Sequence, residues 1–217
     1  MYSAESVVDA RNILTSVRAA PQNTTLAGVC AGGWMAMSAA LTPGAGAVVL
    51  LSPIIWALQT RECKAVAAGI PVDASGLDNV RRSRRLQVKH ILRRYLPYPL
   101  WRGLGCIGVT QVPEVALSAL LRRGVDVTVV LTPPDHTWFV GQRGLEGLRR
   151  LHRKGLRPQL VIGEQGDHSL MHRAMRERAM AEVLRAVGHR SADRDAVTVH
   201  PVVLGQYAEL HEPGRAQ

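Results

Sequence analysis

A continuous run of five apolar residues, AVVLL at 47–51, limits most strongly how this chain folds. Strands that are apolar without alternation lie in parallel sheets whose two faces are both covered by helices. A short strand at 24–29 and a buried helical segment, WMAMSAAL at 34–41, come directly before this run. Strand, helix and strand in this order form a βαβ unit, so the chain is predicted to belong to the α/β class.

Apolar periodicity predicts further elements on both sides of this unit. An amphipathic helix is expected at 3–19, ending before Pro21. After position 110 we expect helices at 113–123, 141–154 and 170–187, and strands at 125–131 and 159–162. Together these elements predict a mostly parallel sheet of about four strands.

The pattern also predicts how the 217 residues are divided. A core is expected at 1–57 and 111–189, interrupted at 58–110 by a helical insertion in which prolines, glycines and arginines replace the regular alternation. The segment 190–217 is polar and is interpreted as a C-terminal tail. With 47% hydrophobic residues, the chain can bury the core of one medium-sized domain.

Three chemically reactive side chains follow three of the predicted strands. Cys30 follows the first, Asp135 follows the third in TPPDHTW, and His168 follows the fourth in GEQGDHSL, and each is expected in the loop after its strand. The carboxyl ends of parallel strands form one edge of a sheet, so these side chains are expected to lie close together. Asp167 is a rival acid, but it adjoins the histidine in sequence and would reach the imidazole ring with difficulty. The set suits a nucleophile, an orienting acid and a general base.

The residues around Cys30 favour a nucleophile on a tight strand-to-helix turn. Such a residue has a strained backbone, and the positions two before and two after it must be small; here they are Gly28 and Gly32. The positive end of the following helix would favour the thiolate. The backbone N–H of Ala31 would donate to an oxyanion. The opposing interpretation is a small buried cysteine, because free cysteine is among the most buried residue types.

The segment GVCAGG resembles the nucleophile elbow of the α/β-hydrolase family, with cysteine in place of the more common serine. The chain order of nucleophile, acid and histidine also agrees with that family. Cysteine elbows of this kind occur in dienelactone hydrolases and polyhydroxyalkanoate synthases, and GVCAGG looks particularly like the latter's motif. No other motif ties the chain to either subfamily.

The resemblance implies an α/β-hydrolase-like fold with 58–110 as its lid. It also implies hydrolysis or transfer of an acyl group, from an ester or thioester substrate, through an acyl-cysteine intermediate. Cys30 would be the nucleophile and His168 the base and acid. Asp135 would be the histidine's partner, and Ala31 N–H an oxyanion donor.

The resemblance covers about residues 3–187 and matches only the C-terminal half of the family's fold. The N-terminal strands of the full fold, with the loop that supplies a second oxyanion donor, have no counterpart in this sequence. Losing one such donor lowers the rate by a factor on the order of a hundred to a thousand. We therefore expect a shortened chain, or an oligomer or partner chain that covers the edge of the sheet at 24–29. The alternative function is a non-catalytic domain that binds a partner or an anionic surface through its basic insertion.

The net charge of +10 favours an anionic partner. Arg81, Arg85, Lys89 and Arg93 share one face of a predicted helix within the insertion and are candidates for contact with an anionic substrate group or surface. A solvated helix face is an equally good interpretation. Specific nucleic-acid binding is not expected, because no recognition motif accompanies the arginines.

The cysteine spacing and the N-terminal sequence give the remaining expectations. Three cysteines without a CxxC pair argue against a disulfide framework and a zinc site, and no cofactor is expected. Cys63 and Cys106 lack a nearby base and are interpreted as structural. No signal-peptide pattern begins the sequence, and the longest apolar run, at 45–58, is too short to span a bilayer, so a cytoplasmic location is expected.

Overall fold

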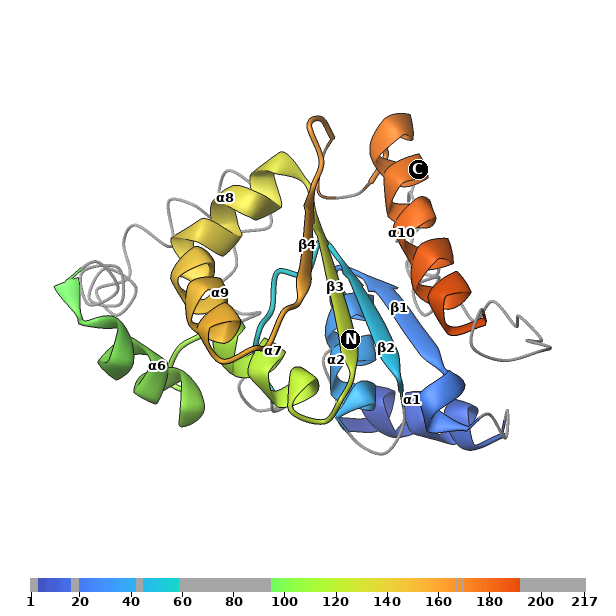
Figure 1. The fold of residues 1–217 in the computed structure, drawn as a ribbon, viewed down its shortest axis with the longest axis horizontal. Helices are drawn as coiled ribbons and strands as arrows, with labels where there is room; N and C mark the ends of the chain where they lie inside the picture. Colours follow the sequence, from blue (N-terminus) through green and yellow to red (C-terminus); the bar gives the residue numbers. More distant parts are fainter. Residues whose placement is uncertain are drawn as a thin grey trace, which may run out of the picture.

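The centre of the fold is a four-stranded parallel sheet (Figure 1). The computed structural model describes residues 4–16, 20–41, 45–58, 95–166, 168 and 170–191. The strands are β1 (Thr25–Val29), β2 (Ala47–Leu51), β3 (Asp126–Leu131) and β4 (Gln159–Ile162), and they lie side by side in that order. Every neighbouring pair is parallel. The predicted α/β class and four-stranded parallel sheet are therefore confirmed.

Helices flank both faces of this sheet (Figure 1). They are α1 (Ala4–Ser16), α2 (Ala31–Ala40), α6 (Tyr98–Cys106), α7 (Pro113–Leu121), α8 (Pro133–Gly141), α9 (Gly144–Arg153) and α10 (Arg173–Ser191), with a short 3-10 helix at Pro21–Asn23. Each helix predicted in the core has a counterpart among them.

The apolar run of β2 is buried on both of its sides. Val48 and Leu50 belong to a core that includes Trp34 of α2 and residues of α7 and α9. Val49 and Leu51 belong to a second core that includes Met175 of α10. Successive strand residues point to opposite faces, so a strand covered on both faces needs apolar residues at every position.

Two predicted helix boundaries were wrong. The helix expected at 141–154 begins only at Gly144, and a separate helix, α8, precedes it. Arg143 separates the two helices in a left-handed conformation, with φ of 60°. The helix expected from 170 begins at Arg173, because Leu170 also has a positive φ, of 56°, that an α-helix cannot accommodate.

The two ends of the predicted insertion lie together at the sheet. The backbone N–H of Trp56 donates to the side-chain oxygen of Gln111 at 2.9 Å. The indole N–H of Trp34 donates to the carbonyl of Ala57 at 2.9 Å. Residues 59–94, which include the four basic residues singled out above and Cys63, lie outside the described residues, as does the tail from 192. The division into core, insertion and tail stays a prediction.

No helix within the described ranges is both long enough and apolar enough to cross a membrane.

Candidate functional site

Cys30 occupies the sharp turn between β1 and α2. Its φ of 52° and ψ of −112° lie in a region that residues other than glycine rarely adopt. The backbone N–H of Cys30 donates to the carbonyl of Leu51 at 2.9 Å, so the turn is fixed to the end of β2. Cys30 is half-buried. Strained positions of this kind concentrate at functional sites because the surrounding structure must hold them in place.

Glycine backbone makes the tight turn sterically feasible. A Cβ atom on Gly28 would lie 2.1 Å from the carbonyl oxygen of Gly32 and 2.7 Å from the backbone nitrogen of Gly33. At Gly28 the backbone of β1 therefore approaches the first turn of α2 so closely that no residue with a Cβ atom fits there. Ala31 is the first residue of α2, and the first N–H groups of a helix have no acceptor within the helix. These groups are available to bind negative charge beside the thiol.

His168 and Asp135 form a direct contact. His168 Nδ1 lies 2.7 Å from Asp135 Oδ1, and the side chains are 36% and 5% exposed. Asp135 lies in the first turn of α8 rather than in a loop, which corrects the expected local structure. Pro133 and Pro134 precede it, and proline is favoured at the start of a helix because it lacks only an N–H that would stay unpaired there.

The imidazole also contacts the thiol. The hydrogen bond to Asp135 and then the hydrogen bond to Cys30 raise the pKa of His168 to about 10, although burial acts in the opposite direction. Because Nδ1 is engaged by Asp135, Nε2 is the nitrogen left for Cys30. The structure thus brings the three residues of the predicted set together: Asp135 contacts His168 directly, and His168 interacts with Cys30.

Two hydroxyl groups that the sequence patterns did not reveal surround the acid. Burial alone would raise the pKa of Asp135, but hydrogen bonding to His168, Thr132 and Ser52 outweighs burial and lowers it. The Thr132 hydroxyl donates to Asp135 Oδ2. The Ser52 hydroxyl is fully buried, but no hydrogen bond of acceptable geometry reaches it. Ser52 therefore lowers the pKa of Asp135 less than Thr132 does. Both residues come directly after strands, Ser52 after β2 and Thr132 after β3, so the strand-end rule applied to every strand would have found them.

Three further residues were singled out in the sequence, namely Cys63, Cys106 and Asp167. Cys106 is exposed at the end of α6, so burial in the core does not support its structural interpretation. Asp167 and Cys63 lie outside the described residues. Within the described part of the chain, no three His, Cys, Asp or Glu side chains gather in a way that would hold a metal ion.

Comparison with known proteins gives no relative: no protein-family model, curated protein sequence or solved structure significantly matches this chain. A thiol, an imidazole and an ionised carboxylate in sequential contact are suited to covalent acyl transfer.

Proposed function

We propose that this chain is an α/β-hydrolase-like cytoplasmic enzyme that hydrolyses or transfers the acyl group of an ester or thioester through an acyl-Cys30 intermediate. The observation that carries the proposal is the chain of contacts from Asp135 through His168 to Cys30, with Cys30 in a strained turn at the start of a helix. The three residues also come from the carboxyl ends of β1, β3 and β4, where catalysis in parallel sheets takes place.

In the first half-reaction, the Cys30 thiolate attacks the substrate carbonyl carbon. His168, with a pKa of about 10, is protonated at neutral pH and stabilises that thiolate. A bond forms between sulphur and the carbonyl carbon, and an electron pair moves to the carbonyl oxygen, where Ala31 N–H donates. When the oxyanion collapses, the bond from carbon to the leaving oxygen or sulphur breaks. His168 gives that leaving group its proton.

In the second half-reaction, the neutral imidazole activates water or an acceptor alcohol. His168 takes a proton from the acceptor as the acceptor's oxygen bonds to the acyl carbon. The bond between that carbon and the Cys30 sulphur then breaks, which restores the thiolate and the imidazolium. Asp135 remains ionised throughout because its pKa is lowered, and it keeps Nδ1 protonated and the ring oriented.

A second oxyanion donor would complete the site. In the resembled family it comes from strands that precede the elbow strand, and β1 is an edge strand of the sheet formed by the described residues. We propose that a pairing segment or partner chain lies along β1 and supplies this donor, since an unpaired edge is also an aggregation hazard.

Ester and thioester cleavage by the full chain tests the proposal. A p-nitrophenyl ester and an acyl thioester should both be cleaved, and an acid quench during turnover should leave an acyl adduct on the peptide that contains Cys30. Cys30→Ala and His168→Gln should abolish cleavage, whereas Cys106→Ala, which changes an exposed thiol at the end of α6, should cleave at the wild-type rate. A wild-type chain with neither turnover nor adduct, or a Cys30→Ala variant with full activity, would favour the non-catalytic alternative.

A further inference from the structure

Helix α6 is apolar on two of its sides. Tyr98 and Trp101 are each 3% exposed and pack with Val112. Leu100 and Leu104 lie four residues apart on another side of the same helix, and Ile107 follows directly after its end. An apolar helix side that is left outside the core is suited to a further apolar environment.

This outer side is well exposed. Leu100 is 59% exposed and Leu104 is half-buried, while Ile107 and Val109, both just beyond the helix, are 71% and 47% exposed. We call Leu100, Leu104, Ile107 and Val109 the α6 stripe. Isolated apolar residues are common on protein surfaces, but a contiguous group marks an interaction site.

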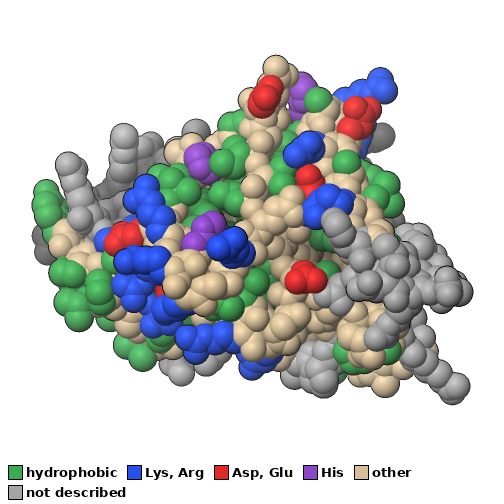
Figure 2. Space-filling model, in the orientation of Figure 1, with side chains coloured by type: hydrophobic (Ala, Val, Ile, Leu, Met, Phe, Trp, Pro, Cys, Tyr) green, Lys and Arg blue, Asp and Glu red, His purple; other side chains and the backbone are tan. Residues whose placement is uncertain are grey.

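Basic side chains lie over α9. Arg149 and Arg153 are exposed, lie four residues apart on this helix, and have no ion-pair partner among the described residues. Figure 2 shows blue Lys and Arg side chains gathered over α9, next to green hydrophobic side chains over α6, on one face of the molecule. Arg149 and Arg153 thus add positive charge, unneutralised among the described residues, on the helix whose Arg150 contacts Tyr98 of α6.

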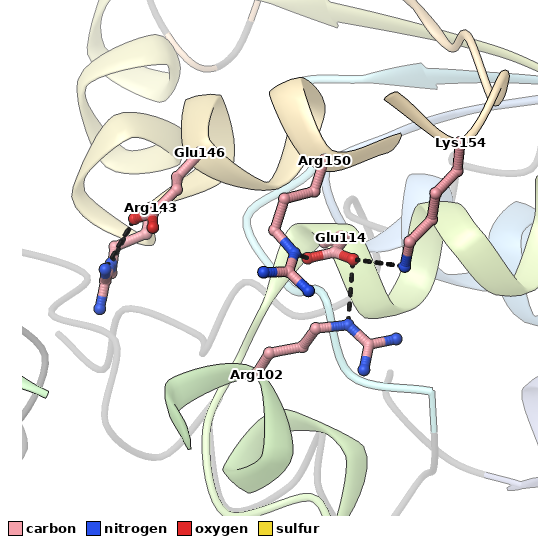
Figure 3. Close-up of polar contacts among 6 residues, drawn as sticks. All are labelled: Arg102, Glu114, Arg143, Glu146, Arg150 and Lys154. Atoms are coloured by element: carbon pink, nitrogen blue, oxygen red, sulfur yellow. Dashed lines mark hydrogen bonds and ion pairs between the residues drawn. The ribbon is translucent and has the colours of Figure 1, made fainter. Parts of the chain in front are cut away.

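Buried contacts fix α6 against α9. Glu114 of α7 has a fully buried side chain and is approached by Arg102 Nε at 3.0 Å, Arg150 Nε at 3.6 Å and Lys154 Nζ at 3.8 Å (Figure 3). Arg102 comes from α6, whereas Arg150 and Lys154 come from α9 and the residue after it. The carboxylate thus links three elements.

An aromatic ring adds a second link between α6 and α9. The guanidinium groups of Arg143 and Arg150 lie 5.0 and 5.4 Å from the centre of the Tyr98 ring. Arg143 also donates to the carbonyl of Leu96 at 2.6 Å, just before α6. These contacts fix α6, which carries Leu100 and Leu104, relative to α9, which carries Arg149 and Arg153.

We propose that the α6 stripe, together with Arg149 and Arg153, docks on an anionic phospholipid bilayer. The aliphatic side chains would enter the boundary between headgroups and acyl chains, and the arginines would contact anionic headgroups. Nucleic acid is a poorer fit, because single strands are bound through stacking aromatic rings and the stripe is aliphatic. This inference is independent of the proposed catalysis and uses residues outside the Cys30 site.

Vesicle sedimentation with the full chain tests the proposal. Binding to vesicles of phosphatidylcholine with about 30% phosphatidylserine should exceed binding to phosphatidylcholine alone, and should weaken as salt is raised. Arg149→Gln with Arg153→Gln should weaken binding about 25-fold, since each arginine contributes about fivefold. Leu100→Ser with Ile107→Ser should weaken it about a hundredfold, because two large aliphatic side chains no longer enter the bilayer.

Matched controls come from α10, which covers the opposite face of the sheet (Figure 1). Met180 and Leu184 are 56% and 61% exposed, and Met180→Ser with Leu184→Ser should bind vesicles as the wild type does. Arg173→Gln with Arg176→Gln is the corresponding charge control. Thermal unfolding would establish that every variant is folded. Equal binding to both vesicle types, no binding, or equal losses in the control variants would overturn the proposal. The proposal would also be overturned if the chain bound an acidic protein or an oligonucleotide but did not bind vesicles.

Discussion

The contact between β1 and α2 makes a quantitative prediction for Gly28→Ala. The new Cβ would lie 2.1 Å from the carbonyl oxygen of Gly32, where contacts below 3.0 Å do not occur. The atoms it meets belong to backbone, so no side-chain rotation relieves the overlap, and strand and helix must separate by about 1 Å. We expect a loss of about 3 kcal/mol in the free energy of unfolding, the upper end of the usual range for overpacking.

The same separation should affect Cys30. A displacement of about 1 Å at a catalytic group lowers the rate about a hundredfold. For a chain of this size, the stability loss corresponds to a fall of roughly 6 to 12 °C in the Tm. Scanning calorimetry measures the Tm, and initial-rate ester cleavage together with alkylation of the Cys30 thiol measures the state of the site.

Gly103→Ala is the matched control. Gly103 lies inside α6, and a Cβ added there would meet nothing within 4 Å, so alanine should raise stability by about 0.4 to 1 kcal/mol and leave the site unchanged. If Gly28→Ala retained the Tm and Cys30 reactivity of Gly103→Ala, the close approach at the elbow would be refuted.

Three further predictions concern charged groups. Asp135→Asn should lower kcat by roughly ten-thousandfold and shift the pH profile of kcat, because the amide no longer holds His168 protonated. A pH profile that matches the wild type would contradict this role. Glu114→Gln should lower the free energy of unfolding, measured in urea, by about 2 kcal/mol. This is less than the loss of a fully buried ion pair costs, because the cationic partners of Glu114 are 28 to 41% exposed. An unchanged free energy of unfolding would show that Glu114 does not link these helices. The raised pKa of His168 contributes stability in full below its ordinary value of 6.5, and this contribution is lost as pH rises through about 10. The lowered pKa of Asp135 contributes stability above its ordinary value of 3.8, which is lost as pH falls below it. Tm should therefore be highest between these two ordinary values and decline toward pH 10, with a weaker alkaline decline in His168→Gln.

The strands, and the gathering of the three candidate residues at one edge of the sheet, were predictable because the signals are local. Continuous apolar runs identify strands buried on both faces, and parallel strands bring their carboxyl ends to one edge wherever those ends lie in the sequence. Cys30, Asp135 and His168 could therefore be associated across more than a hundred residues without knowledge of the distances between them.

Long-range pairing explains what the sequence did not reveal. Glu114 resembles an ordinary first-turn acid, and its cationic partners come from α6 and from the end of α9. The two prolines before Asp135 fit a turn as well as the start of a helix, so α8 was missed. Ser52 and Thr132 carry common hydroxyl groups whose role depends on where Asp135 lies.

The most direct test of the central claim is the rate at which iodoacetamide alkylates Cys30 in the folded chain at about pH 6, followed by peptide mass. Pairing with protonated His168 predicts that Cys30, although half-buried, reacts faster than the exposed Cys106. In His168→Gln, the Cys30 rate should fall by about tenfold or more while the Cys106 rate is unchanged. A Cys30 that is inert, or that reacts equally fast in His168→Gln, would contradict its assignment as the activated nucleophile.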